Sequence, residues 1–157
     1  MATEQRKEAA GHNTSNMKLP VNECFACGPD NPDGMKLLFV FDESKHQATC
    51  EFQLARRFQG PPGHAHGGII ATILDEAMGK VNKLRSVVAF TKSMDVRYLK
   101  PVPLDAPLKA VGFERYVEGR EHHNSAEIRN QNGDVLATSE GVFIAMDLER
   151  IKAKLNL

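Results

Sequence analysis

The sequence lacks an excess of either charge, a full set of paired cysteines and any long hydrophobic run. Lysine and arginine together number 20, as do aspartate and glutamate, so the formal net charge is zero. A balanced chain has no general attraction to nucleic acid or to an anionic membrane, and we expect neither as a partner. The hydrophobic residues, 41% of the chain, occur in runs far shorter than the roughly 18 residues that a membrane span needs.

A length of 157 residues accommodates one domain with a substantial core. Residues 1–20 are polar and contain no apolar stretch, which argues against a secretory signal and predicts a disordered leader. We assign residues 21–150 to the domain and residues 151–157 to a frayed C-terminal tail. Because no export signal is evident, the expected location is the cytoplasm.

The three cysteines are an odd number, which argues against a disulfide framework. Cys24 and Cys27 have the spacing of half a zinc site, but no second cysteine pair is present. Completing the site would require Cys50 or a histidine from elsewhere in the chain. The turn formers of residues 28–34 favour a simpler interpretation, a loop that leads into the first strand, and we expect no metal.

Hydrophobic periodicity predicts an α+β domain with one central helix. After Pro61, Pro62 and Gly63 the apolar spacing changes to that of a helix, which continues to about Val81. Strand-like runs cover residues 35–41, 46–54, 86–98, 108–117, 125–130 and 135–146. Their short, hairpin-like connections predict about five antiparallel strands packed on the helix. Since a small sheet on one helix leaves a flank to be covered, we also expect an oligomer.

Two adjacent acids lie on the polar side of the predicted helix. The opposite, apolar side consists of Ile69, Ile70, Ile73, Leu74, Ala77, Met78 and Val81. Glu76 has Lys80 four residues further on, which predicts an exposed ion pair and no role in chemistry. Asp75 has Ala71 and Gly79 at that spacing, so no cation of the helix balances its charge and small side chains leave room around it. Asp75 is therefore the candidate catalytic carboxylate, with a merely solvated aspartate as the alternative.

The start of the helix supplies a second candidate feature. Gly67 and Gly68 allow the backbone to approach a ligand closely, and the free N–H groups of a helix N-terminus stabilise negative charge. His66 precedes them, although a lone loop histidine is more often structural. Together with Asp75, these residues predict a site that stabilises an oxyanion.

Residues 86–98 alternate in the manner of a long, half-buried strand. One face would hold Val88, Phe90, Met94, Val96 and Tyr98, and the other would hold Thr91, Ser93, Asp95 and Arg97. This alternation predicts that Thr91 and Ser93 share the polar face.

Several short motifs, in their order and spacing, resemble the hotdog-fold acyl-CoA thioesterases. They are His66-Gly67-Gly68, Leu74-Asp75, Thr91 at the opening of an alternating strand, and Tyr98-Leu99-Lys100-Pro101 at its end. The similarity extends over about residues 24–147 and is close to the branch with the phenylacetate-pathway and thioesterase-superfamily-member enzymes. The resemblance implies a curved antiparallel sheet wrapped around one long helix. It also implies a homodimer with joined sheets and shared active sites, with a dimer of dimers, a homotetramer, as the alternative assembly.

The resemblance implies roles for three catalytic residues. Asp75 matches the acid that acts as nucleophile or general base. The backbone N–H of Gly67 matches the group that polarises the thioester carbonyl. Thr91 corresponds to a hydroxyl residue that the partner subunit brings to the acid.

The expected substrate-binding residues are Gln59, His66, Gly68 and Ser93. The amide of Gln59 resembles one that orients substrate or water. Lys92 departs from the family pattern, which has a small or apolar residue there, and would alter the acyl pocket, contact a phosphate or extend to solvent.

These features predict a thioesterase that hydrolyses an acyl-CoA to a free acid and CoA. No cofactor is expected, because CoA is part of the substrate. Two alternatives stay open. One is a hotdog hydratase or dehydratase, which would pair the acid with a catalytic histidine, and the other is a non-catalytic acyl-CoA-binding module.

Overall fold

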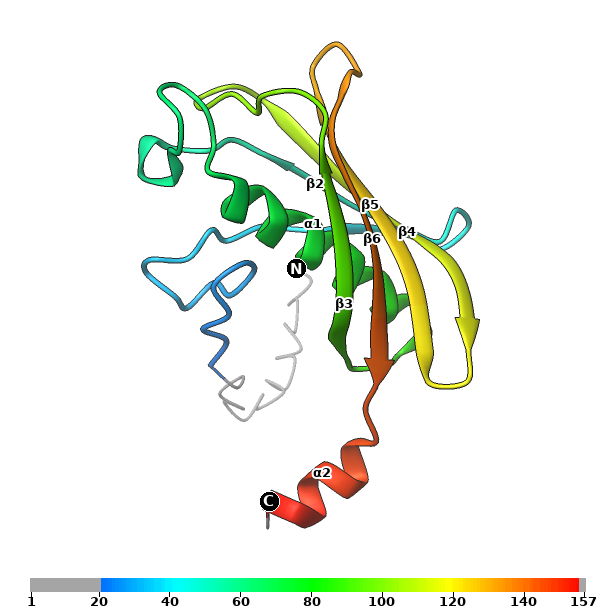
Figure 1. The fold of residues 1–157 in the computed structure, drawn as a ribbon. Coiled ribbons are helices and arrows are strands. Elements are labelled where there is room, and N and C mark those ends of the chain that lie inside the picture. The colour runs from blue at the N-terminus through cyan, green and yellow to red at the C-terminus, as the bar shows by residue number, and fades with distance from the viewer. Residues whose placement is uncertain (1–20, 156–157) are drawn as a thin grey trace, which may run out of the picture.

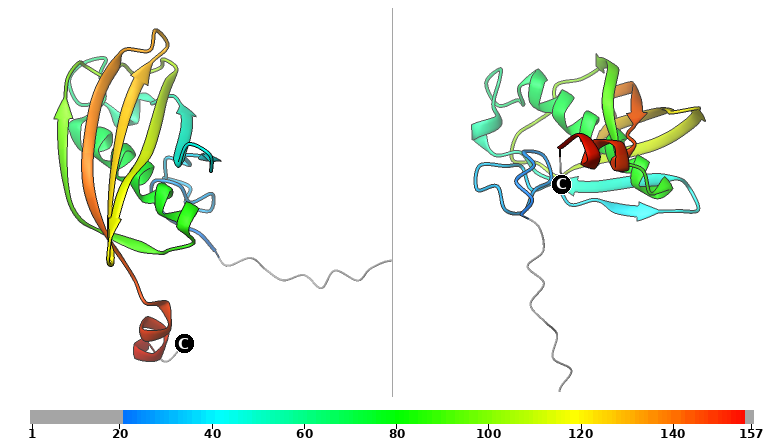
Figure 2. Two further views of the ribbon diagram at one scale, coloured as in Figure 1. Left: turned by 90° about the vertical axis from the view of Figure 1, so that its right-hand side faces the viewer. Right: turned by 90° about the horizontal axis from the view of Figure 1, so that it is seen from below.

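One curved antiparallel sheet wraps around a single long helix in the computed structural model, which describes residues 21–155 (Figure 1). The sheet has the strand order β1-β2-β4-β5-β6-β3. Its strands are β1 Val40–Asp42, β2 Gln47–Phe52, β3 Ala89–Tyr98, β4 Leu108–Glu118, β5 Glu121–Asn130 and β6 Val135–Ala145. The helices are α1 Gly67–Val81, α2 Leu148–Leu155 and two short 3₁₀ helices, Arg56–Phe58 and Asn82–Arg85. The predicted α+β hotdog architecture is confirmed, with six strands rather than about five (Figure 2).

The apolar side of α1 forms the centre of the core. All of its predicted members are buried except Ile69, which is partly buried against the same cluster. Gly112 of β4 allows the sheet to approach closely, because a Cβ there would collide with the carbonyl of Ala77. The buried amide of Asn124 on β5 donates to the carbonyl of Met78 at 3.0 Å. These contacts fix the orientation of α1 relative to the sheet, and this orientation sets the directions in which its polar side chains point.

The region before β2 differs from the predicted strand over residues 35–41. Only Val40–Asp42 pairs with β2. Further upstream, the N–H of Met35 donates to the carbonyl of Phe25 at 2.8 Å. This part of the chain is therefore tied to residues 22–34, which we call the cysteine loop, rather than to the sheet.

The two ends of the chain were expected to be irregular. The predicted leader, residues 1–20, lies outside the described residues. In place of a frayed tail, the structure has the helix α2, whose first turn is capped by a hydrogen bond from the N–H of Arg150 to Oδ1 of Asp147 at 3.1 Å. None of the helices within residues 21–155 combines the length and the apolar composition that crossing a membrane requires.

A β-bulge interrupts β3 at Lys92. Thr91 pairs with Phe143 of β6, and Ser93 pairs with the preceding residue, Val142, which leaves Lys92 as the extra residue. One extra residue exchanges the two faces of a strand. The side chains before the bulge therefore point to the opposite side from that expected for a regular strand.

The bulge makes part of the predicted alternation over residues 86–98 wrong. After the bulge, Met94 packs against the core as expected. Before it, Phe90 is 61% exposed, although the pattern predicted that it would be inside. Thr91 consequently faces α1, while Ser93 faces the outer side of the sheet.

Candidate active site

Asp75 of α1 and Thr91 of β3 meet between the helix and the edge of the sheet. The Thr91 hydroxyl donates to Oδ1 of Asp75 at 2.7 Å. Burial raises the pKa of Asp75 above its ordinary value; the hydrogen bond from Thr91 opposes this shift, and the nearby charge of Glu76 adds to it. A half-buried carboxylate with a raised pKa is a stronger base than one in water, which suits proton transfer.

This contact corrects the expected origin of the hydroxyl. The resemblance implied that Thr91 reaches the acid from the partner subunit, whereas the structure forms the hydrogen bond within one chain. The physical reason is the bulge at Lys92, which turns Thr91 from the outer face of β3 toward the helix of its own subunit.

The N-terminus of α1 keeps one backbone donor for a ligand. His66 is the N-cap residue, and its Nδ1 accepts from the N–H of Gly68 at 2.9 Å. His66 and Gly68, which were expected to bind substrate, therefore bind each other. Gly67 is the first residue of the helix, so its N–H has no acceptor within the helix. This N–H retains the geometry of an oxyanion donor.

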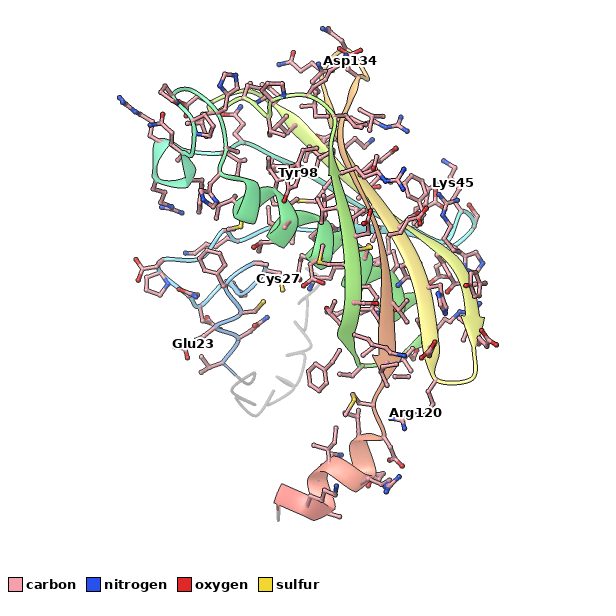
Figure 3. The ribbon with its side chains drawn as sticks, in the orientation of Figure 1. Glu23, Cys27, Lys45, Tyr98, Arg120 and Asp134 are labelled. Atoms are coloured by element: carbon pink, nitrogen blue, oxygen red, sulfur yellow. The ribbon has the colours of Figure 1, made fainter. Side chains whose placement is uncertain are left out.

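Tyr98 is a site residue to which the sequence analysis gave no role in the site, although it placed Tyr98 on one strand face and in a motif. Its hydroxyl donates to the carbonyl of Gly67 at 3.0 Å (Figure 3). A pocket of 400 Å³ adjoins both residues, and Ile70, Leu99 and Val102 are among its apolar lining residues. The available signal was an aromatic residue with a polar tip at the end of a predicted strand, a type that contacts apolar and polar groups together.

Gln59 and Ser93 occupy different surroundings from those predicted. Gln59 lies in the loop before α1, where its Oε1 accepts from the N–H of Gly63 at 3.1 Å. Its amide NH₂ is the group left to meet a substrate. Ser93 lines a 640 Å³ pocket on the outer side of the sheet, together with Tyr116. That pocket is on the opposite side of the sheet from Asp75, so the structure does not bring Ser93 to the candidate site.

The candidate oxyanion donor, Gly67, and the candidate acid, Asp75, are far apart within one chain. Gly67 and Asp75 are separated by more than two turns of α1, which corresponds to about 12 Å along the helix axis at ~1.5 Å per residue. An oxyanion donor must lie within about 3 Å of the developing charge, and the attacking group within about 3.5 Å of the carbonyl carbon. The span from donor to acid through one thioester carbonyl, even with an attacking water between the acid and the carbonyl carbon, is shorter than this rise, which disfavours the use of both groups of the same subunit.

On another side of α1, Glu76 belongs to a half-buried cluster. Nζ of Lys80 lies 3.1 Å from Oε1 of Glu76 and 3.0 Å from Sγ of Cys27. The predicted ion pair is confirmed, but the Glu76 and Lys80 side chains are only 18% and 13% exposed instead of lying on an open surface. Cys24, Cys27 and Glu76 also bring three possible metal-ligand atoms within 4.8 Å of one another. The group that joins the cysteine pair is thus a carboxylate, and neither Cys50 nor a histidine.

The charges of this cluster depend on its contacts. Burial raises the pKa of the Cys27 thiol to about 11, and the hydrogen bond with Glu76 adds to the shift. Burial would lower the pKa of Lys80, but its hydrogen bonds to Cys27 and Glu76 outweigh this effect and raise it. Lys80 is therefore a cation at neutral pH.

The Lys92 side chain extends to the solvent, 54% exposed, on the outer side of the sheet. Its Nζ lies 2.5 Å from Oε1 of Glu121, at the start of β5. The ion pair holds the bulge residue on the outer side of the sheet.

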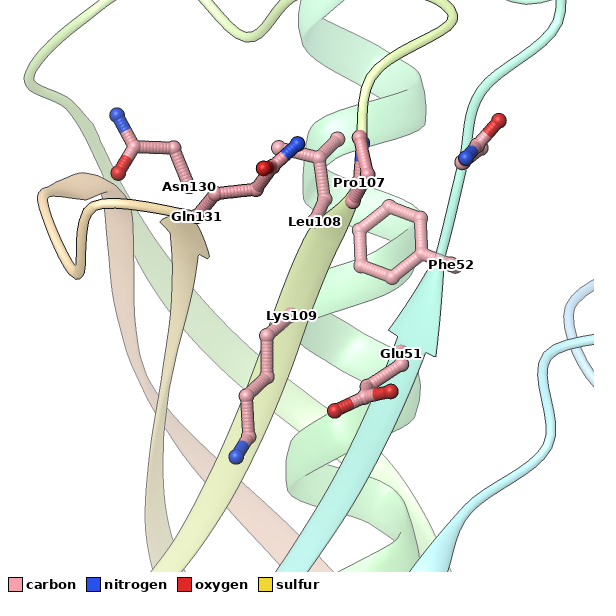
Figure 4. Close-up of a pocket in the computed structure, with 8 residues that line it drawn as sticks. Glu51, Phe52, Pro107, Leu108, Lys109, Asn130 and Gln131 are labelled. Carbon is pink, nitrogen blue, oxygen red and sulfur yellow. The ribbon is translucent and has the colours of Figure 1, made fainter.

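A further pocket, of 540 Å³, opens where β2 ends and β4 begins (Figure 4). Phe52, Leu108 and Lys109 are among its lining residues, whereas Asp75 and Gly67 are not. It is separate from the candidate active site.

Residues 62–137 match the model of the Thioesterase superfamily. Acyl-coenzyme A thioesterase THEM5 of Homo sapiens is 28% identical over 117 residues, which cover 74% of this chain and 47% of the relative. Acyl-coenzyme A thioesterase THEM4 of Mus musculus is 30% identical over 118 residues, which cover 74% of this chain and 51% of the relative. The chain thus spans about half the length of the curated relatives it matches.

Solved structures show the same similarity. The crystal structure of a thioesterase superfamily protein superposes with a TM-score of 0.74 and 31% identity, over 78% of this chain and 60% of that one. The PaaI protein from the phenylacetic acid degradation operon of E. coli gives a TM-score of 0.66 and 17% identity, over 72% of this chain and 81% of that one. At that identity the likeness concerns the fold alone. The chain has the hotdog fold of the thioesterase superfamily, and the predicted resemblance to this family is confirmed.

Proposed function

We propose that this protein is an acyl-CoA thioesterase whose active sites are shared between the two subunits of a homodimer. One observation carries the proposal. The Asp75 carboxylate and the Gly67 N–H suit the two halves of thioester hydrolysis, yet the two residues are separated by about 12 Å of rise along one helix. A second copy of the chain would bring the Gly67 of one subunit to the Asp75 of the other.

The β3 edge of the sheet offers a surface for this second copy. Phe90, Tyr98 and Leu99, on or beside this edge strand, are 61%, 54% and 56% exposed. An unpaired edge with exposed apolar side chains favours pairing with another strand. Two antiparallel β3 strands, related by a two-fold axis, would join the sheets and run the two α1 helices in opposite directions. Asp75 of each subunit would then face Gly67 of the other.

In the shared site, the Gly67 N–H would stabilise the negative charge that develops on the thioester oxygen. The hydrogen bond from Thr91 fixes Oδ1 of Asp75 and leaves Oδ2 to accept a proton from water. We favour this general-base route, because the short aspartate leaves room for a water molecule between the carboxylate and the carbonyl carbon. The other route is direct attack by Asp75, which forms a mixed anhydride.

A single turnover in heavy-oxygen water separates the two routes. General-base catalysis places the solvent oxygen in the product acid. Direct attack followed by addition of water to the Asp75 carbonyl of the anhydride leaves an unlabelled Asp75 oxygen in the first product and the heavy oxygen in the enzyme carboxylate, so label in Asp75 identifies direct attack. Mass spectrometry of the product and of the Asp75 peptide measures both.

Several observations support acyl-CoA as the substrate. The relatives THEM4 and THEM5 are named acyl-coenzyme A thioesterases, and similar structures hold acetyl CoA or coenzyme A. The apolar pocket beside Gly67 and Tyr98 suits an acyl or pantetheine chain. The reaction needs no cofactor besides the CoA of the substrate, and we propose the cytoplasm as its location.

The geometry favours hydrolysis over the hydratase alternative. A hydratase would pair the acid with a catalytic histidine, whereas the partner of Asp75 is Thr91, and His66 caps the start of the helix. A binding module would release no CoA from any member of a panel of short, medium, long and aromatic acyl-CoAs. A CoA-release assay on this panel therefore tests the activity itself.

Mixed dimers test the shared site. Gly67→Pro removes the N–H at the first helical position, where proline is well tolerated, and the extended backbone of His66 suits a following proline. An equal mixture of Asp75→Asn and Gly67→Pro subunits should recover about a quarter of wild-type activity, since half of the dimers are mixed and each holds one intact site.

A second mixture serves as the control. A mixture of Asp75→Asn and Thr91→Val subunits would regain activity if the hydroxyl came from the partner subunit. We expect no gain, because the Thr91 hydroxyl contacts Asp75 of its own subunit. If tagged subunits exchange and the mixture with Gly67→Pro stays inactive, the shared site is wrong.

A further inference from the structure

We propose that Cys24, Cys27 and Glu76 form a zinc site that ties the cysteine loop to α1. The two sulfurs and a carboxylate oxygen all lie within 4.8 Å of one another. In tetrahedral zinc sites with Zn–S bonds of about 2.3 Å, neighbouring sulfurs are about 3.8 Å apart. The three atoms therefore need only a small movement to bind one ion. This site revises the expectation of no metal, because the missing ligand is a carboxylate that the fold brings in.

The cysteine loop is built to hold its two sulfurs together. The N–H of Gly28 donates to the carbonyl of Cys24 at 2.8 Å, and a Cβ on Gly28 would collide with the backbone of Cys24 and Asn22. Oδ1 of Asn22 accepts from the N–H of Cys24 at 3.2 Å, while the N–H of Asn22 donates to Oδ2 of Asp30 at 2.7 Å. This tight, hydrogen-bonded turn places Cys24 and Cys27 on one side before any ion binds.

The third ligand comes from a distant part of the chain. Glu76 projects from α1 toward the loop, and Cys27 lies beside this helix in Figure 3. A hydrogen bond from Arg57 to the carbonyl of Gly34, 3.2 Å long, also holds the loop to the body of the domain. The unfolded chain does not hold such distant residues together, so an ion bound by them would stabilise the folded state. Cys24, Cys27 and Cys50 are all free thiols, so no disulfide stabilises the described part of the chain in this way.

The cluster already attracts positive charge. The ammonium of Lys80 lies 3.0 Å from Sγ of Cys27 and 3.1 Å from Oε1 of Glu76. Two thiolates and a carboxylate carry three negative charges, which zinc and Lys80 together balance. Lys80 would then donate a hydrogen bond to a ligand of the ion, and such a bond orients the ligand.

The ligand types select the metal. Thiolates favour zinc over magnesium or calcium, which prefer oxygen ligands. Three protein ligands leave the fourth tetrahedral position open. Neither Asp75 nor Gly67 belongs to the set, so this site does not depend on the proposed thioesterase activity.

Metal analysis of the whole protein tests the proposal. We expect the reduced protein, loaded with zinc and then dialysed, to retain one zinc ion per chain. Titration with cobalt(II) should produce the thiolate-to-cobalt charge-transfer band and the strong visible bands of a tetrahedral site, and zinc should abolish them. This spectrum is measured on the wild-type chain, so it does not depend on whether a variant folds.

Single substitutions identify the ligands. Cys24→Ser and Cys27→Ser should each lose the bound zinc, and Glu76→Gln should lower the affinity at least about tenfold. Cys50→Ala, which removes the buried thiol outside the cluster, is the matched control and should keep the ion. Circular dichroism checks that each variant is folded.

Three results would overturn the zinc site. The first is a wild-type protein that gives no cobalt–thiolate band and retains no zinc. The second is equal zinc retention by a variant that lacks both Cys24 and Cys27. The third is a Cys24–Cys27 disulfide that persists in reductant and excludes zinc, which would identify the pair as a redox couple. Unchanged affinity of Glu76→Gln would remove Glu76 from the ligand set.

Discussion

Two neighbouring acids on one helix have opposite surroundings. Asp75 faces the neutral hydroxyl of Thr91 at the edge of the sheet, while Glu76 faces the ammonium of Lys80 and the thiol of Cys27. Successive residues of a helix point about 100° apart, so a shift of one position selects a different set of neighbours. Because no cation offsets its charge, Asp75 is available for proton transfer, whereas the charge of Glu76 is already neutralised.

The substitution Asp75→Asn should have the largest effect and tests this difference directly. The amide keeps the shape and a hydrogen bond with Thr91 but cannot accept a proton, so we expect kcat to fall at least about a hundredfold with the fold intact. Steady-state CoA release and thermal unfolding measure the two properties. Near wild-type turnover would end the assignment of Asp75.

The next effect concerns the far end of the same helix. Gly67→Pro should lower kcat about a hundredfold, because it removes one oxyanion donor. Gly67→Ala is the matched control, since it keeps the N–H and its Cβ would meet Tyr98 at an ordinary 3.6 Å. If alanine and proline have equal effects on turnover, the loss is steric and the N–H has no role.

Thr91→Val should have a smaller effect. The variant keeps the branched shape but loses the hydrogen bond to Asp75, a loss of about 1.4 kcal/mol or roughly tenfold in kcat. Ser93→Ala, two residues along the same strand but on its outer face, should leave turnover unchanged. Equal losses in both variants would contradict the exchange of faces at the bulge.

Glu76→Gln should affect activity least. We expect turnover within a few-fold of wild type and, in the zinc-free protein, a free energy of unfolding lower by about 1 kcal/mol, because the ion pair with Lys80 is lost. Chemical denaturation and the CoA-release assay measure these effects. A loss of turnover as deep as that of Asp75→Asn would show that the wrong acid had been chosen.

Local pattern was sufficient to predict the helix and its catalytic candidate. The 3.6-residue period placed Ile73 and Met78 in the core and Asp75 on the polar side, and the structure agrees. The faces of β3 could not be predicted in the same way. A bulge depends on which residues of β6 pair with Thr91 and Ser93, and a strand pattern assumes that no residue is extra.

The chain alone specified the α+β class, the position of α1, the place of Asp75 on the polar side of that helix and the Gly67 turn, because each follows from the pattern of residues near in sequence. Folding in three dimensions was needed to bring Thr91 to Asp75, to engage Gly68 with His66 and to place the cysteine loop beside Glu76. These contacts connect separate elements or depend on the exact turn geometry. The distances in these contacts are set by the packing of the whole core, and the spacing of residues along the sequence does not determine that packing.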